Sequence, residues 1–364
     1  MGRRVKFLQD RRGRITDDRV ERRTRTALQT DHVTMKMLAA LMLSGAFGLA
    51  TAQPVPGGMD VQWQEGARDC AEAEWEPLQV HAYEAATFIL RQHPCAHFEA
   101  NFLYLLIGSE RALLIDTGAV AEPARMPLAE TVLDLLPERE TGPMPLVVAH
   151  SHGHRDHRTG DGQFASLPSV RVVPAGTGID AAFGFDGWPD ASGRIDLGDR
   201  IVHVLTASGH HPGHVVFYDE RTALLLSGDF LLPGRLLVDD LDAYRESASR
   251  VIAFLDDRPV AHILGGHLEL DARGRPYRRT ATYRPDQGPL ELDKQALLAL
   301  PAALRDFTGF YARHPRFVIS HPLHNLMALA VLLLAALATA VWGIAKLLIR
   351  RRKLARKAAH LPRN

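Results

Sequence analysis

The chain has little cysteine, since Cys70 and Cys95 are the only two among 364 residues. Their spacing is not that of paired metal ligands, so neither is predicted to bind zinc. A metal site in this chain therefore has to use histidine and carboxylate. The two thiols have two interpretations of about equal weight: one disulfide in an oxidising compartment, or two unrelated buried side chains.

The central part of the chain has a deficit of positive charge. Between Gln53 and Ala345 there are 24 Lys and Arg against 37 Asp and Glu, a net charge of −13, although the whole chain carries +1. The bases are concentrated in residues 1–34 and from Lys346 onward, where eight bases and no acid occur. An acidic body repels phosphate backbones, which counts against nucleic acid as a partner and against a nuclease.

Residues 1–34 lack hydrophobic periodicity, are rich in arginine, and so cannot form a packed core. They are predicted to be a basic disordered extension, or untranslated if the protein starts at Met35. Residues 35–52 have the basic start, apolar middle and small-residue end of a signal peptide, which would act as a membrane anchor if it is not cleaved. Residues 53–100 then form a lead-in to the main domain.

The stretch from Leu326 to Ala345 contains no charged residue. At about 1.5 Å per residue, a helix of this length spans a hydrocarbon core about 30 Å thick. We predict a transmembrane helix over 326–349. The alternative, a buried core helix, does not explain the bases that follow it.

The basic tail, residues 350–364, is predicted to be cytoplasmic because positive charge is retained on that side of the membrane. Together with the signal peptide, this places the body outside the cytoplasm, on the periplasmic side, in a single-pass membrane protein. Such a location favours the disulfide between Cys70 and Cys95.

The chain is rich in histidine at one place, directly after the apolar, strand-like run 146–149. His152 and His154 alternate, so an extended backbone points both imidazoles to one side, and Asp156 and His157 can face a second ion from the following turn. Four ligand-type residues within six positions favour a metal site over scattered surface or core histidines. Histidine and carboxylate suit zinc, and also manganese or iron.

Other ligand-type residues also follow apolar runs. Asp116 ends a predicted hairpin formed by 103–107 and 112–115, Asp229 follows the strand 222–227, and His267 follows 261–264. His210 lies in a tight loop formed by glycines and a proline. Helices are predicted at 128–136, 243–255 and 290–311, which makes the fold α/β (α+β). Asp116 can orient a ligand imidazole, or is a plain turn residue.

These residues resemble the metallo-beta-lactamase superfamily. Residues 151–157 are similar to its His-X-His-X-Asp-His signature and residues 209–214 to its Gly-His-X-Pro-Gly-His loop. Asp116, Asp229 and His267 match the remaining landmarks in order. The resemblance covers about 101–267 and implies a four-layer αβ/βα sandwich, in a catalytic domain over 101–320, with a two-metal site between the sheets.

The resemblance also implies a role for each site residue. The first metal would be held by His152, His154 and His210, the second by Asp156, His157 and His267, and both by Asp229 as a bridge. Asp116 and His214 would support these ligands, and His150 and His211 have no assigned role. The bridging aspartate favours the glyoxalase II-like and lactonase-like branch over the lactamases.

The implied activity is hydrolysis of a small-molecule ester, thioester, lactone or related bond. Two zinc ions, or manganese or iron, about 3.5–4 Å apart lower the pKa of a shared water and make a bridging hydroxide, with Asp156 as a proton acceptor. One alternative is an iron-dependent oxidoreductase resembling persulfide dioxygenases, although no flavin-binding domain is recognisable. The other is a non-catalytic membrane-tethered sensor or binding protein.

The basic segment that follows the last predicted ligand has two open interpretations. Arg278, Arg279, Tyr283 and Arg284 form either an anion-binding surface or a solvated charge run, and the second is favoured.

Overall fold

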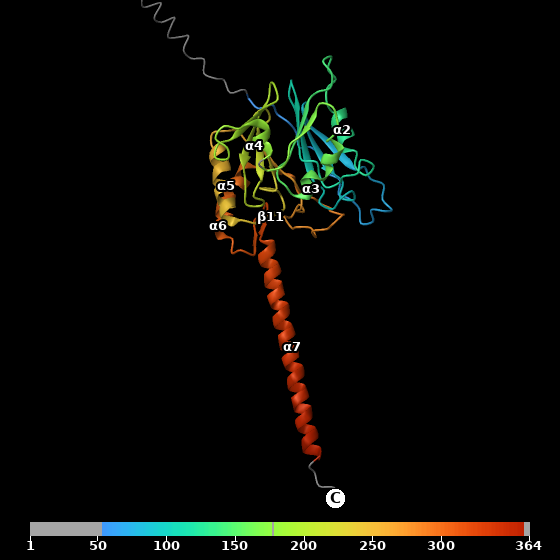
Figure 1. Ribbon diagram of the computed structural model, residues 1–364, viewed down its shortest axis with the longest axis vertical. Helices are drawn as coiled ribbons and strands as arrows, with labels where there is room; N and C mark the ends of the chain where they lie inside the picture. Colours follow the sequence, from blue (N-terminus) through green and yellow to red (C-terminus); the bar gives the residue numbers. More distant parts are fainter. Residues whose placement is uncertain (1–52, 177, 360–364) are drawn as a thin grey trace, which may run out of the picture. The chain divides into compact units, whose positions relative to one another are not determined.

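Two six-stranded sheets form the body of the computed structural model, which describes residues 53–176 and 178–359 (Figure 1). The predicted basic extension, the signal peptide and the last five residues of the predicted tail lie outside these ranges.

The first sheet has the order β1-β2-β3-β4-β5-β6, with antiparallel pairing from β1 to β4 and parallel pairing from β4 to β6. Its strands are β1 (Leu78–Glu84), β2 (Thr87–Gln92), β3 (Phe102–Ile107), β4 (Ala112–Ile115), β5 (Leu146–Ala149) and β6 (Val170–Val172). The predicted hairpin is therefore confirmed. The predicted division at residue 100 cuts through one sheet, because β1 and β2 lie in the stretch 53–100.

The second sheet has the order β13-β12-β10-β9-β8-β7, in which only the β10–β12 pair is parallel. Its strands are β7 (Gly193–Asp196), β8 (Ile201–Thr206), β9 (Val215–Asp219), β10 (Leu224–Gly228), β12 (His262–Gly265) and β13 (Glu291–Leu292). The strands predicted at 222–227 and 261–264 are both found here, shifted by no more than about two residues.

Strands of both sheets are buried on both faces. In β3, Phe102 and Tyr104 pack between the sheets, whereas Leu103 and Leu105 pack on the outer face. Side chains alternate along a strand, so two covered faces require an uninterrupted apolar run, which is what the sequence shows.

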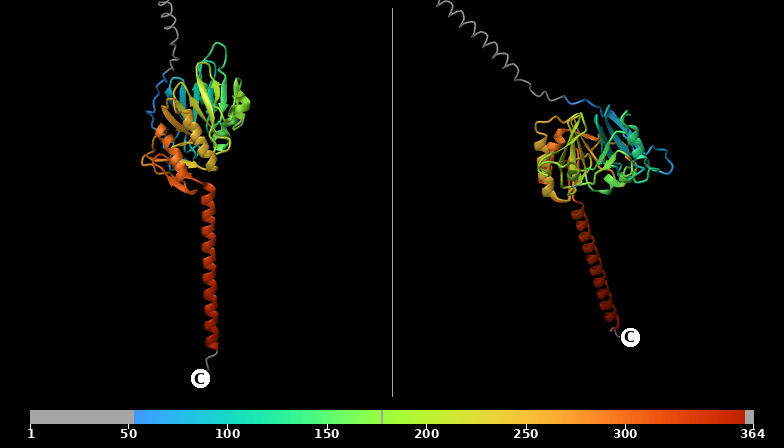
Figure 2. Two further views of the ribbon diagram at one scale, coloured as in Figure 1. Left: turned by 90° about the vertical axis from the view of Figure 1, so that its left-hand side faces the viewer. Right: turned by 45° about the horizontal axis from the view of Figure 1, so that its top comes forward.

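Helices cover the two outer faces, and the result is a sandwich of four layers. Helix α2 (Leu128–Asp134) packs on the first sheet, and helices α5 (Leu241–Phe254) and α6 (Lys294–Asp306) pack on the second. Figures 1 and 2 show α2 on one side of the paired sheets and α5 with α6 on the other. The αβ/βα architecture implied by the resemblance is thus present.

Helix α6 is shorter than the predicted helix 290–311. Asp293 caps it by accepting a hydrogen bond from the backbone N–H of Ala296 at 2.9 Å, so residues 291–292 are free to pair as β13. Helix α4 (Gly178–Phe183) and strand β7 lie between the two sheets' main strands in the chain order, after β6 and before β8.

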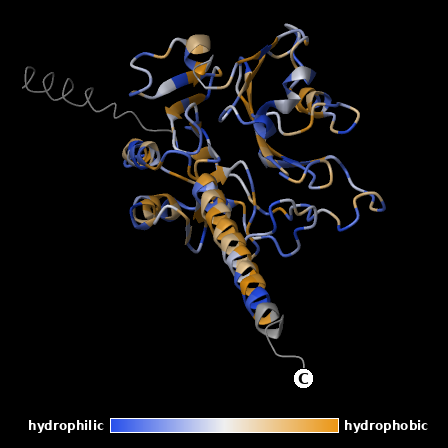
Figure 3. Cartoon of the chain, turned by 60° about the horizontal axis from the view of Figure 1, so that its bottom comes forward, coloured by the Kyte–Doolittle hydropathy of each residue, from blue (hydrophilic) through white to orange (hydrophobic). Residues whose placement is uncertain are grey.

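A small third sheet leads into the last helix. It has the order β11-β15-β14, formed by Arg235–Leu237, Val318–Ser320 and Tyr311–Arg313. Helix α7 (Pro322–Ala359) follows β15 directly, and its segment Pro322–Leu354 is long and apolar enough to cross a membrane. Figure 3 shows that most of this helix is coloured hydrophobic, with hydrophilic residues toward its C-terminal end, and no part of its most apolar window is buried in the protein, so it is not a core helix of this body.

Cys70 and Cys95 form a disulfide across a separation of 25 residues. It ties the segment before β1 to the loop between β2 and β3. Next to it, His93 accepts a hydrogen bond at its Nδ1 from the backbone N–H of Cys95 and stacks on Trp75. Of the two interpretations of the thiols, the disulfide is the one the structure has.

Replacing both cysteines by serine should lower the free energy of unfolding by about 3 kcal/mol, because a closed loop of this length restricts the unfolded chain. Urea unfolding of the full chain in detergent, with and without reductant, measures the effect. Reductant should destabilise the natural chain and leave the double variant unchanged. Equal stability of the two oxidised proteins would contradict the prediction.

Candidate metal centre

The ends of two parallel strand pairs, one from each sheet, place the candidate ligands. In the first sheet Ile115 of β4 lies opposite Ala149 of β5, and Asp116 and the histidine-rich turn follow these residues. In the second sheet Gly228 of β10 lies opposite Gly265 of β12, and Asp229 and His267 follow. Parallel strands end at the same edge, so the two sheets bring these residues together.

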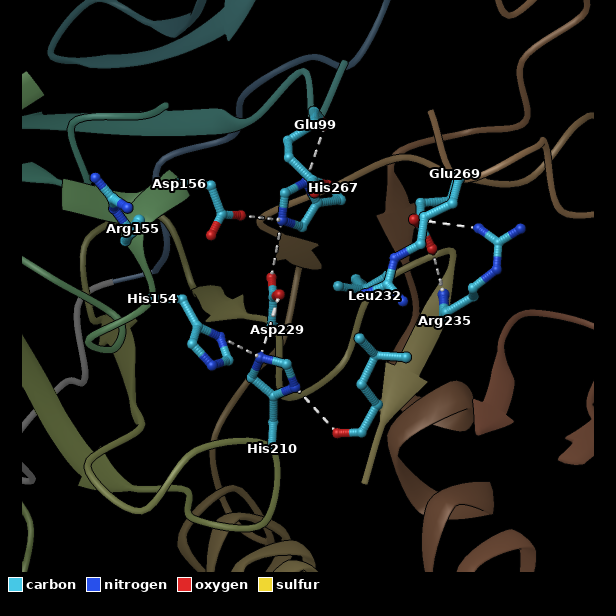
Figure 4. Close-up of a pocket in the computed structure, with 12 residues that line it drawn as sticks. Glu99, His154, Arg155, Asp156, His210, Asp229, Leu232, Arg235, His267 and Glu269 are labelled. Carbon is cyan, nitrogen blue, oxygen red and sulfur yellow. Dashed lines mark hydrogen bonds and ion pairs between the residues drawn. The ribbon is translucent and has the colours of Figure 1, made fainter. Parts of the chain in front are cut away.

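Three imidazoles converge on one point. The Nδ1 atom of His154 lies 2.9 Å from Nε2 of His152 and 3.0 Å from Nε2 of His210 (Figure 4 shows His154 and His210). This trio corresponds to the predicted ligands of the first metal. His152 comes from the β5 end, His154 caps the short helix α3 (Arg155–Arg158), and His210 comes from the β8–β9 loop.

A second group lies beside it. The Oδ2 atom of Asp156 lies 3.4 Å from Nε2 of His157 and 3.4 Å from Nε2 of His267. These are the predicted ligands of the second metal, and one ligand atom from each lies within 4.8 Å of the others.

Asp229 lies between the two groups. Its Oδ1 is 3.5 Å from Nε2 of His157 and 3.4 Å from Nε2 of His267, whereas its Oδ2 is 3.5 Å from Nε2 of His210. One carboxylate thus presents an oxygen to each group, which is the arrangement that a bridging ligand needs (Figure 4).

Three of the imidazoles have their tautomer set by a hydrogen bond on the far side of the ring. Each ring donates its Nδ1–H at 2.8–3.0 Å: His210 to the Leu237 carbonyl, His267 to the Glu99 carbonyl, and His157 to Oδ2 of Asp116. Each Nε2 therefore directs a lone pair into the site, as metal ligation requires.

The charge distribution also fits a cation. Burial by itself raises the pKa of Asp229, but the imidazoles of His267 and His157 outweigh it and hold that pKa well below its usual range. Burial lowers the pKa of His152 and His210, which keeps them neutral. Among the described residues, Nε2 of His157 and Oδ1 of Asp229 are buried without a hydrogen-bond partner. Converging lone pairs beside an ionised, unsatisfied carboxylate are donors suited to divalent metal ions.

Asp116 makes the contacts that an orienting carboxylate would need. It accepts hydrogen bonds from the backbone N–H of Ser151 and from the Ser151 hydroxyl, both at 2.8 Å, in addition to the one from His157. It does so with a φ of +66°, an unfavourable backbone conformation that recurs at functional sites.

Two glycines leave space for the site. A side chain at Gly266 would meet Oδ1 of Asp229 at 2.8 Å and Cε1 of His157 at 2.9 Å. At Gly228, with φ of +49°, it would meet the Ser151 side chain at 2.6 Å. Both positions therefore favour glycine on steric grounds.

His214, His150 and His211 also lie close to the site. His214 accepts a hydrogen bond at Nε2 from the backbone N–H of Asp229 at 3.1 Å and stacks on His152, so it contacts two of the candidate ligands. His150, which had no assigned role, links the carbonyl of Val173 to Oδ1 of Asp161. His211 packs edge-on against His154.

The pocket over the two groups contains residues that the sequence did not single out. Besides the ligands, it is lined by Glu99, Arg155, Leu232, Arg235, Leu237, Glu269 and Arg279 (Figure 4). Only Arg279 comes from the predicted basic segment, since Arg284 is buried and donates to the Leu268 carbonyl. A further contact was not predicted either: Asn101 donates to Oδ2 of Asp156 at 3.4 Å. No motif marks these residues, because they become neighbours only in the folded chain.

Comparison with known proteins identifies the family. The model of the metallo-beta-lactamase superfamily matches residues 98–267, which contain every candidate ligand. The chain belongs to this superfamily. Acyl-coenzyme A thioesterase MBLAC2 of Gallus gallus is 26% identical over 214 residues, 50% of this chain and 77% of the relative. Hydroxyacylglutathione hydrolase of a Synechococcus strain is 30% identical over 135 residues, 37% of this chain and 50% of the relative.

Solved structures include a metallo-beta-lactamase from Pontibacter korlensis, 19% identical, with a TM-score of 0.44 over 63% of this chain and 100% of that one. The sequence relatives place this superfamily member in the glyoxalase II-like branch. It is a metal-dependent hydrolase, as predicted.

Changing Asp116→Asn should weaken metal binding by about 10- to 100-fold, because the amide cannot accept hydrogen bonds from both Ser151 and the Nδ1–H of His157. Competition with a chromogenic chelator measures the affinity. Glu130→Gln, an exposed change on α2, is the matched control and should bind metal as the natural chain does. Unchanged affinity in D116N would show that Asp116 is only a turn residue.

Proposed function

We propose that this chain is a membrane-anchored hydrolase that holds two divalent metal ions, zinc in the first instance, and cleaves a thioester or a related ester. The observation that carries the proposal is the Asp229 carboxylate, whose two oxygens face the two histidine-containing groups. Metal ions held there lower the pKa of water toward neutrality and polarise the carbonyl oxygen of the substrate.

The substrate bond is suggested by the relatives. Acyl-coenzyme A and hydroxyacylglutathione both carry an acyl group on a thiol, so the two names share one bond type. In its hydrolysis, water adds oxygen to the acyl carbon and the carbon–sulfur bond breaks with its electron pair on sulfur. The two protons of water pass to the thiolate and to solvent.

The chain's own residues supply orientation and proton transfer. Asp156 sits at the edge of the second group, partly open to the pocket, where it can accept a proton released in the reaction. Arg155 and Arg279 are exposed at the pocket wall, and neither has a carboxylate partner within 4 Å in the described part of the chain. They can hold an anionic group of the substrate.

The site argues against one of the two alternatives, the sensor. A sensor with a degenerate site would be expected to lose a ligand, whereas all seven predicted positions converge here. The same ligands also suit iron, so metal content together with oxygen consumption is the measurement that separates an iron-dependent oxidoreductase from a hydrolase.

The change Asp229→Asn should abolish thioester hydrolysis, because the neutral amide cannot bridge two cations. Turnover of a chromogenic thioester measures activity, and elemental analysis of protein purified without added metal should find two equivalents of zinc in the natural chain. Removal of the metal ions with a chelator should stop turnover, and added zinc or manganese should restore it.

Asp242→Asn, an exposed carboxylate on α5, is the control and should retain full activity. Iron with oxygen consumption would overturn the hydrolase proposal in favour of the oxidoreductase. A cellular function that survives D229N unchanged would support the sensor.

We also propose that α7 crosses the membrane with its basic end in the cytoplasm and the catalytic body on the other side. The bases at 350–353 follow the apolar segment directly, and positive charge is retained on the cytoplasmic side. The Cys70–Cys95 disulfide is consistent with an oxidising compartment for the body.

Protease added outside intact spheroplasts should therefore degrade the catalytic body, whereas a fluorescent protein fused after the tail should fold, fluoresce and stay protected. A soluble cytoplasmic protein in the same spheroplasts is the control, and the added protease should leave it intact. A protected body beside a degraded fusion would reverse the proposed orientation.

A further inference from the structure

The small sheet connects the metal centre to the first turn of α7. The carbonyl of Leu237 in β11 accepts the hydrogen bond that orients His210. Leu237 lies opposite Ser320 of β15, the last residue of that strand. Only His321 separates Ser320 from Pro322, where α7 begins. Figure 1 shows β11 at the end of the body from which α7 leaves.

This connection is rigid at its root. The side chain of Asn325 donates to the Phe310 carbonyl at 3.0 Å, and Nδ1 of His324 donates to the Gly309 carbonyl at 2.9 Å. The backbone N–H of His321 also donates to the Phe310 carbonyl, at 3.2 Å. The first helical turn is thus bound to the loop before β14 and is not a free linker.

The distance from the site to the helix is consequently short. Neighbouring strands lie about 4.8 Å apart, and two residues of extended chain add at most about 7 Å. The start of α7 therefore lies within roughly 15 Å of the His210 ring. The polar headgroup zone on each side of a bilayer is itself several ångströms thick, so a membrane that encloses α7 has its surface close to the pocket.

Side chains around the root are those of a membrane interface. Phe310 and Tyr311 are 48% and 51% exposed, and Leu323 in the first turn is 58% exposed. Aromatic residues next to a transmembrane segment favour the headgroup level. They set the height of the body above the hydrocarbon core.

The pocket has two chemical faces. Leu237, on the strand beside the helix root, supplies apolar surface next to the buried Leu232, whereas Arg155 and Arg279 supply positive charge. Glu269, which also lines the pocket, is paired with Arg235 at 3.2 Å, and Glu99 is the other carboxylate of the lining outside the candidate ligands. The pocket thus suits a molecule with an apolar acyl part and an anionic head.

Building on the proposed function, we propose that the substrate is an amphiphile that resides in the membrane: a long-chain acyl thioester or ester with an anionic head. The enzyme takes it from the bilayer surface beside α7, not from free solution.

The test uses the full chain in phosphatidylcholine vesicles with two thioesters of the anionic chromophore nitrothiobenzoate. The butyryl thioester is soluble, and the palmitoyl thioester partitions into the bilayer. A third substrate, the palmitoyl thioester of uncharged nitrothiophenol, tests the role of Arg155 and Arg279. It should react more slowly than its anionic counterpart. Equal rates for these two would contradict the anionic head.

The decisive variant has a flexible Gly/Ser segment of about 20 residues between Ser320 and His321, which separates body and membrane by about 25 Å on average. We expect it to hydrolyse the butyryl thioester as the natural chain does and the palmitoyl thioester about tenfold more slowly, because the effective substrate concentration at the pocket falls. The control has the same segment between Gly142 and Pro143, a surface turn away from the helix root, and should hydrolyse both substrates normally.

The outcomes are distinct. If the spacer variant cleaves both thioesters as the natural chain does, the substrate does not come from the membrane surface and the inference is wrong, while the proposed hydrolase stands. If the natural chain cleaves neither thioester, the proposed function itself fails.

Discussion

The contact of the Asp229 carboxylate with imidazoles from both sides of the site is the interaction on which the rest of the structure depends. His157 lies in α3, which follows β5 of the first sheet, whereas His267 follows β12 and His210 lies in the β8–β9 loop of the second. The carboxylate can meet them all only if the two sheets pack face to face with the ends of their parallel strands together. The apolar core between the sheets, including Phe102 and Phe217, holds that arrangement and removes water from the ligands.

Burying so many polar groups is costly unless each has a partner, and the structure meets this cost by layers of hydrogen bonds. Asp116, the Leu237 carbonyl and the Glu99 carbonyl each accept from one ligand ring. Asp116 is positioned by a strained turn, Leu237 by the small third sheet, and Glu99 by the loop that the disulfide ties. The ligand atoms are therefore held in place before any metal binds, which is how a site achieves precise geometry.

The same contacts connect chemistry to location. Strand β11 both orients His210 and pairs with the strand that leads into α7, so these backbone contacts connect the candidate metal centre to the start of that helix. A pocket elsewhere on the sandwich would have no such backbone connection to α7. Here α7 and the pocket share one element, which is the basis of the proposed coupling between substrate access and membrane attachment.

The sequence by itself determined the strands, the ligand candidates and the apolar C-terminal segment, because these are local patterns: apolar runs, histidine spacing and the absence of charge. It left open the pairing of Cys70 with Cys95, placed the domain boundary inside a sheet, and did not mark Glu99, Leu237 or Glu269. These depend on contacts between residues far apart in the chain. Only the tertiary structure decided them, since packing of two sheets, not spacing along one strand, brings such groups within hydrogen-bonding distance.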